Sequence, residues 1–128
     1  MRIPLLMLAL VAAPAPAQEP EWRTAQDTEV ALRAFGYEPR MIRLPADRPV
    51  RLRFVNNSRS TLSFAAPGFF RAARVRSRDS DLVVGGSLRL APGERRTVAL
   101  VPARGRYRLH SGNLAHRLLG MRGTIVAE

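Results

Sequence analysis

The segment GRYRLHSGNLAHRLLGM, residues 105–121, is the most informative part of this chain. Its first part alternates apolar and basic side chains, which predicts a strand from Arg106 to His110. A loop follows, and a second short alternating run predicts a last strand from Gly123 to Ala127. Between the two strands, three polar or sulfur-bearing side chains recur at a fixed spacing of five residues: Ser111, His116 and Met121.

The rest of the chain repeats this alternation in short runs. The clearest is Val50 to Asn56, where apolar residues alternate with arginines, and the side chains of residues 56–58 are expected to bond to nearby backbone and end that strand. Clusters of Pro, Gly and Asn separate the runs, and no helical period is present. These features predict an all-β antiparallel sandwich of seven to eight strands. Leu88–Leu90 and Val98–Leu100 flank a Pro-Gly turn and are predicted to pair as a hairpin.

Residues 105–121 resemble the C-terminal ligand loop of the cupredoxin family, the plastocyanin/azurin-like blue-copper proteins. The family pattern is roughly Gly-x-Tyr-x-x-x-Cys-x4-His-x4-Met, and this chain matches it except that Ser111 stands at the cysteine. The resemblance implies a Greek-key, cupredoxin-like sandwich over residues 28–128. Four further segments agree with the family in order: Tyr37–Pro39, Val50–Asn56, Phe64–Phe70 and Leu90–Glu94.

The resemblance also implies which positions would hold copper. In the family the ligands are two histidines, a cysteine and a methionine. Leu62 stands where the family has its first histidine, and Ser111 stands where it has cysteine, so only His116 and Met121 keep ligand chemistry. A type 1 copper site needs two imidazoles and a thiolate in one plane, with the thioether as a weak axial contact. The resemblance therefore implies a degenerate site that has lost type 1 copper.

Two alternatives stay open for these four positions. In the first, Leu62 fills the space of the metal and Ser111 bonds to backbone, so that no buried imidazole is left unpaired. Met121 is then a core residue, and His116 is solvated or bonded within its turn. In the second, His116 and Met121 form a weak copper site, since an imidazole and a thioether suit Cu(I). His110 is expected to face outward with Arg106 and Arg108, away from that site.

The start of the chain predicts export. Residues 1–17 contain one Arg, an apolar run and Ala15-Pro16-Ala17, as in a secretory signal peptide that is removed by cleavage. Residues 18–27 show no period and are expected to form a flexible lead-in. The chain has no cysteine, so it has no disulfides. We expect a periplasmic or secreted protein whose mature chain has no transmembrane segment.

Charge and side-chain chemistry narrow the function further. There are 21 basic and 10 acidic residues, and the formal net charge is +11. The basic residues are not interleaved with aromatic ones, as they are in proteins that stack nucleic-acid bases, so no nucleic-acid partner is expected. No nucleophile, base and acid stand at a catalytic spacing, so no enzyme is expected.

The sequence therefore predicts an exported cupredoxin-like domain that acts as a binding or structural module, with no cofactor. The alternative is a weak or partner-completed copper site at His116 and Met121, used in copper delivery or electron transfer. A protein partner is expected at the apolar loop around His116, formed by Leu114, Ala115, Leu118 and Leu119.

Overall fold

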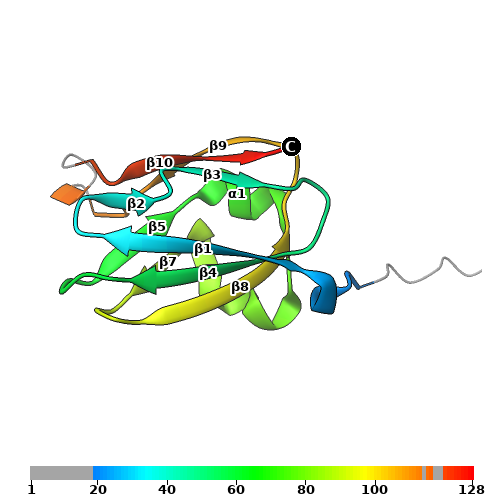
Figure 1. Ribbon diagram of the computed structural model, residues 1–128, viewed down its shortest axis with the longest axis horizontal. Coiled ribbons are helices and arrows are strands. Elements are labelled where there is room, and N and C mark those ends of the chain that lie inside the picture. Colours follow the sequence, from blue (N-terminus) through cyan, green and yellow to red (C-terminus); the bar gives the residue numbers. More distant parts are fainter. Residues whose placement is uncertain (1–18, 114, 117–119) are drawn as a thin grey trace, which may run out of the picture.

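The alternating runs of the sequence form ten strands in two sheets that pack face to face (Figure 1). The structure is a computed structural model, and it describes residues 19–113, 115–116 and 120–128. The predicted signal peptide, residues 1–17, lies outside this part of the chain, as do Leu114, Leu118 and Leu119.

Sheet A has the strand order β2-β1-β4-β8-β6. Its strands are β1 (Gln26–Arg33), β2 (Gly36–Glu38), β4 (Val50–Asn56), β6 (Arg74–Val75) and β8 (Arg95–Val101). Sheet B has the order β3-β10-β9-β5-β7. Its strands are β3 (Met41–Leu44), β5 (Leu62–Ala65), β7 (Ser87–Leu90), β9 (Gly105–His110) and β10 (Arg122–Ala127). The predicted all-β Greek-key sandwich is thus confirmed, with ten strands in the described residues instead of seven or eight.

The sheets differ from the predicted antiparallel arrangement at two places. β1 pairs with β4 in parallel, and β10 pairs with β3 in parallel. Between β1 and β4 the chain passes through β3 in the other sheet, so β4 returns to sheet A running the same way as β1. Alternation predicts a strand but not its partner. The extra strands β2 and β6 are three and two residues long, too short to show alternation.

The predicted hairpin is wrong, because β7 and β8 lie in different sheets. The turn between them is held by the end of β4. The Gly93 N–H donates to the carbonyl of Asn56 at 2.9 Å, and the Asn56 N–H donates to the Glu94 carbonyl at 3.0 Å. These bonds direct the chain from sheet B to sheet A. Asn56 Oδ1 also accepts the Ser58 N–H at 2.9 Å, as predicted for the end of this strand.

The segment before the sandwich is partly structured. A 3-10 helix, η1, spans Trp22–Thr24, and β1 begins at Gln26, two residues ahead of the predicted domain start at residue 28. The Arg51 Nε donates to Asp27 Oδ1 at 2.7 Å and so ties this segment to β4. That hydrogen bond lowers the pKa of Asp27 below its ordinary value.

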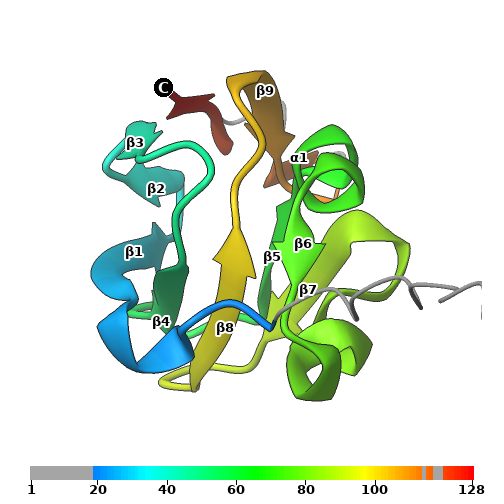
Figure 2. The ribbon, with the colours of Figure 1, turned by 90° about the vertical axis from the view of Figure 1, so that its right-hand side faces the viewer.

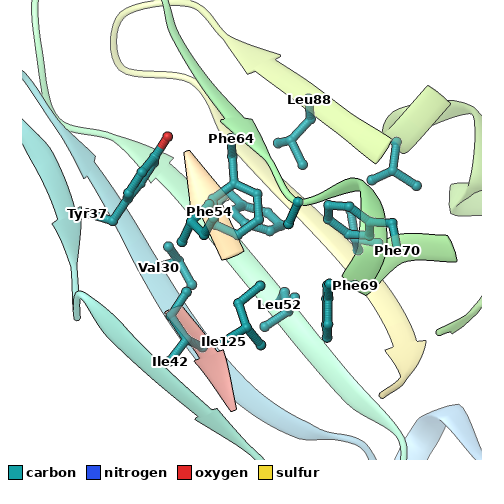
Figure 3. Close-up of a cluster of buried hydrophobic side chains, with 14 of the residues drawn as sticks. Val30, Tyr37, Ile42, Leu52, Phe54, Phe64, Phe69, Phe70, Leu88 and Ile125 are labelled. Carbon is teal, nitrogen blue, oxygen red and sulfur yellow. The ribbon is translucent and has the colours of Figure 1, made fainter. Parts of the chain in front are cut away.

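The core between the sheets is built around aromatic rings (Figure 3). Phe64 on β5 has its ring centroid 4.7 Å from that of Phe54 and 5.5 Å from that of Tyr37, both edge-to-face. Such pairs contribute about 0.5–1.5 kcal/mol each beyond their burial. Tyr107 packs edge-to-face on Phe69, at 5.5 Å between ring centroids. With no disulfide available, this apolar cluster provides most of the stability of the fold.

Two short helical segments close one side of the core. α1 (Pro67–Ala72) lies next to β9, and the 3-10 segment η2 (Ser77–Gly86) follows it (Figure 2). Buried Asp79 joins η2 to sheet A, because its Oδ2 accepts the Ala99 N–H at 2.9 Å and the Arg76 Nε–H at 2.8 Å. The carboxylate is thus paired with a charge and a backbone donor, as a buried anion requires.

Candidate functional site

The four positions that the sequence singles out lie on β5 and on the segment that joins β9 to β10. Leu62 begins β5 and is 1% exposed, while Ser111, directly after β9, and Met121, directly before β10, are fully buried. His116 is partly buried. The Ser111 N–H donates to the Met121 carbonyl, and the Met121 N–H donates to the His116 carbonyl, each at 3.0 Å. The backbone therefore brings Ser111, His116 and Met121 together.

Leu62 joins this group across a small hollow. Leu62 and His116 both line it, together with Ser63, Gly112, Asn113 and Arg89, and its volume is about 310 Å³. The hollow lies where β5 approaches the end of β9, two strands that pair through Ala65 and His110. The fold thus gathers all four positions at one end of the sandwich.

A pair of serine hydroxyls occupies the centre of the site. Ser63 Oγ and Ser111 Oγ lie 3.1 Å apart, and both residues are buried. The Gly112 N–H donates to Ser63 Oγ at 2.6 Å, and the Asn113 N–H donates to Ser111 Oγ at 3.1 Å. Both hydroxyls therefore act as acceptors for the backbone of the loop, which fixes the start of that loop to β5.

Sequence reasoning missed Ser63 and Asn113 as parts of this site. Asn113 Oδ1 accepts the N–H of Ala115 at 2.9 Å and that of His116 at 3.3 Å, so it caps the single turn that holds the histidine. An Asn two residues after Ser111 is a signal for such a turn. Ser63 gave no comparable signal, because its role depends on a contact 48 residues away in the sequence.

Tyr37 supports the same region from the other sheet. Its hydroxyl donates to the Ser63 carbonyl at 2.6 Å, in the interior. Burial raises the pKa of the Tyr37 phenol above its ordinary value, because the ionised form is poorly solvated there. The phenol of Tyr37 thus stays neutral and donates its hydrogen bond to the backbone of Ser63, one of the two paired serines.

The imidazole of His116 differs from the expectation that it is solvated or bonded within its turn. Its Nδ1 is buried and has no hydrogen-bond partner, the only such side-chain nitrogen or oxygen in the described part of the chain. A buried polar atom without a partner costs about 1–3 kcal/mol. The loop backbone holds this ring through the Asn113 cap in spite of that cost.

His110 lies apart from this hollow. Its Nδ1 is 3.0 Å from the carbonyl oxygen of Ser111, and the residue lines a separate groove with Arg106 and Arg108. The predicted alternation of β9 is confirmed, since Leu109 and Ser111 are buried while Arg106 and Arg108 are exposed. The two imidazoles therefore belong to different surfaces.

The donors at this site do not fit a type 1 copper centre. Such a centre needs a thiolate and two imidazoles. Leu62 has no donor atom, and the Ser111 hydroxyl is already bonded to Ser63 and to the Asn113 N–H. One imidazole and one thioether remain. Among residues 19–113, 115–116 and 120–128, no group of three or more His, Cys, Asp and Glu side chains is placed to hold a metal ion.

The described residues also contain no helix that is long and apolar enough to cross a bilayer.

No curated protein matches the sequence. Several solved structures share the fold. Reduced auracyanin from Roseiflexus castenholzii is 17% identical, with a TM-score of 0.60, and the match covers 81% of this chain and 98% of that one. Auracyanin A, a "blue" copper protein from Chloroflexus aurantiacus, is 14% identical, with a TM-score of 0.54, over 80% of this chain and 99% of its own.

A larger protein contains a similar domain. McoA multicopper oxidase from Aquifex aeolicus is 16% identical, with a TM-score of 0.64, over 87% of this chain but only 31% of its own. These identities establish likeness of fold alone. At the level of sequence, residues 2–127 match the family described as cupredoxin-like domain, which is nearly the whole chain. The fold, the ligand-loop spacing and this match together show that the chain belongs to the cupredoxin-like domain family.

Proposed function

We propose that this chain is an exported cupredoxin-like domain that has lost type 1 copper and acts as a non-catalytic binding module. The observation that supports this most directly is the state of the two substituted ligand positions. Leu62 is a core residue, 1% exposed, and the Ser111 hydroxyl has two partners of its own. Arg89 lines the same hollow, and its positive charge opposes a metal cation there.

Export to the periplasm or beyond is part of this proposal. It is supported by the signal-like residues 1–17. A non-catalytic role is supported by the surroundings of the histidines. The Nδ1 of His110 lies against a backbone carbonyl, and the Nδ1 of His116 has no partner in the described residues, so no carboxylate orients either ring as a base.

We place the partner surface at the end of the sandwich that bears His116. Phe35, in the turn between β1 and β2, is 62% exposed and lies at this end: a Cβ added to Gly120 would be 3.4 Å from the Phe35 carbonyl oxygen. Ala115 is exposed on the same loop as His116. An exposed phenylalanine beside a partly buried loop offers apolar area for docking.

The lost-copper part of the proposal is tested by restoring the missing donors. A Leu62→His, Ser111→Cys double variant places a thiolate and a second imidazole beside His116 and Met121. We expect Cu(II) to give it an intense visible absorption, and neither single variant to show one. The matched control is Leu62→His with Ser80→Cys, which moves the thiol to an exposed position. A folded double variant without colour would mean that these residues do not occupy ligand positions.

The binding part is tested by photo-crosslinking in the cells that export the protein. A photoreactive amino acid replaces Phe35 in one variant and Val84, which is 72% exposed on η2, in the control. We expect a discrete adduct from position 35 and none from position 84. Equal, diffuse labelling from both positions would argue against a docking surface at Phe35.

A second candidate function is supported by the unpaired imidazole. His116 Nδ1 and the buried thioether of Met121 are the kinds of donor that Cu(I) prefers, and a partner could supply further ligands during copper delivery. Anaerobic competition with a Cu(I) chelator tests this. Met121→Leu should weaken Cu(I) binding about tenfold or more, whereas the surface control Met41→Leu should not. No difference between the two variants would remove this candidate.

A further inference from the structure

We propose that the outer face of sheet B holds a docking groove for an acidic, extended segment of a partner protein. The groove has a volume of about 1120 Å³. Its lining includes arginines from β9, from β10 and from the residue before β3, as well as His110, and it contains no carboxylate. The arginines are Arg40, Arg106, Arg108 and Arg122. This surface is separate from the His116 hollow, since the two share no lining residue.

The four groove arginines make no ion pair in the described part of the chain. Six other arginines are paired with six of the acidic residues, at Arg33, Arg43, Arg51, Arg74, Arg76 and Arg96. Four of the 21 basic residues of the chain therefore lie in this groove without a paired carboxylate in the described residues. Like charges held together in a concave surface focus a positive potential, which attracts an anionic partner.

The spacing of these charges follows the strands. Arg106 and Arg108 are two residues apart on the outward face of β9, and Arg108 lies opposite Thr124 on β10. Residues i and i+2 of a strand are about 6.6–6.8 Å apart. The carboxylates of an extended polypeptide with acidic residues at alternate positions have the same spacing. Arg122, which lies opposite His110, adds a cation on the neighbouring strand β10. Arginine can bind each carboxylate through two parallel hydrogen bonds.

The shape of the surface favours a polypeptide over a lipid bilayer. The arginines line a hollow together with Pro67 and Gly68 of α1, and an extended segment fits a hollow better than a flat layer of headgroups does. A protein that lies on a membrane also inserts an apolar rim. Of the three large apolar residues that are exposed in the described part of the chain, only Met41, at 38% exposure, lines this groove.

The test uses a synthetic peptide of alternating Glu and Thr, labelled for fluorescence anisotropy at low salt, with a Gln-Thr peptide as reference. An Arg106→Gln, Arg108→Gln, Arg122→Gln triple variant should weaken binding of the Glu peptide about tenfold. The control triple variant, Arg48→Gln, Arg59→Gln, Arg95→Gln, removes the same charge from exposed positions outside the groove that make no ion pair in the described residues. It should change the affinity less than about twofold.

Two outcomes would overturn the proposal. If both triple variants weaken binding equally, the affinity for the peptide depends on the net charge of the protein and not on the arginines of the groove. If phosphatidylglycerol vesicles bind through the groove arginines while the Glu peptide does not, the surface is a membrane contact. The copper and crosslinking experiments at Leu62, Ser111 and Phe35 are independent of both results, because those residues lie outside the groove.

Discussion

Ser63 Oγ and Ser111 Oγ lie 3.1 Å apart in the interior, and together they hold the loop that contains His116 against β5. Each hydroxyl also accepts a backbone N–H, from Gly112 and from Asn113. Ser111, which the sequence comparison aligns with the cysteine of the family, is thus a hydrogen-bonded structural residue. The loop is stabilised by hydrogen bonds within the protein.

The first prediction concerns this serine pair. Ser111→Ala leaves the Asn113 N–H without its acceptor and Ser63 without its hydroxyl partner, so the free energy of unfolding should fall by about 1–3 kcal/mol. Urea denaturation measures it. The control is Ser80→Ala, whose exposed hydroxyl donates to the Ser77 carbonyl, with an expected loss of about 0.5 kcal/mol or less. Equal losses for the two variants would contradict a structural role for Ser111.

A second prediction concerns the pH dependence caused by Tyr37. Burial raises its pKa in the folded state, whereas the unfolded phenol ionises near its ordinary value of about 10. The stability contributed by the neutral phenol is therefore complete below about pH 10 and falls as the pH rises further. Tyr37→Phe should be less stable at neutral pH, because the Ser63 carbonyl loses its donor, and should show a weaker decline in alkali. An unchanged alkaline slope would be incompatible with this account.

A third prediction concerns Glu94, in the turn that joins the sheets. Its pKa is lowered first by the hydrogen bond from the Ala91 N–H, at 2.8 Å, and then by the hydrogen bond from Arg96. A lowered pKa contributes stability that is present above the ordinary pKa of glutamate and is lost as the pH falls through the folded value. Glu94→Gln should therefore have a lower urea midpoint than wild type at neutral pH. The difference should vanish in acid, and Glu29→Gln, an exposed control, should show neither effect.

A fourth prediction compares two neighbouring glycines. Gly85 and Gly86 both have positive φ, but a Cβ on Gly86 would overlap the backbone of Pro67, whereas one on Gly85 meets open space. Gly85→Ala should cost about 1–2 kcal/mol, which is the cost of the left-handed conformation. Gly86→Ala should cost several kcal/mol more, because the overlap disturbs the junction of η2 with α1. Similar melting temperatures for the two variants would contradict this packing.

The sequence predicts the strands better than their partners. Val50 to Asn56 alternates clearly and forms β4 with those bounds, and its end at Asn56 is confirmed. The same alternation predicted a wrong hairpin for β7 and β8. A local pattern does not show that the backbone of Asn56 forms hydrogen bonds with the turn between these strands. The parallel pairing of β1 with β4 was missed for the same reason, since it depends on the path of the chain through the other sheet.

In the candidate site, too, the sequence indicated some of the residues and missed others. The family resemblance singled out Leu62, Ser111, His116 and Met121, and the fold gathers these four positions at one end of the sandwich. It was not sufficient to predict Ser63, because a serine in a strand has no local pattern that indicates a distant hydroxyl partner. It also gave no sign of the unpaired His116 Nδ1, which depends on how the loop buries the ring.

The optical spectrum of the wild-type protein with Cu(II), recorded before and after dialysis, tests the central claim most directly. Under the proposal that Leu62 and Ser111 replace two copper ligands, we expect no intense visible band, and we expect dialysis to remove any copper. An intense band, with one copper ion retained by each chain after dialysis, would contradict the loss of the type 1 centre.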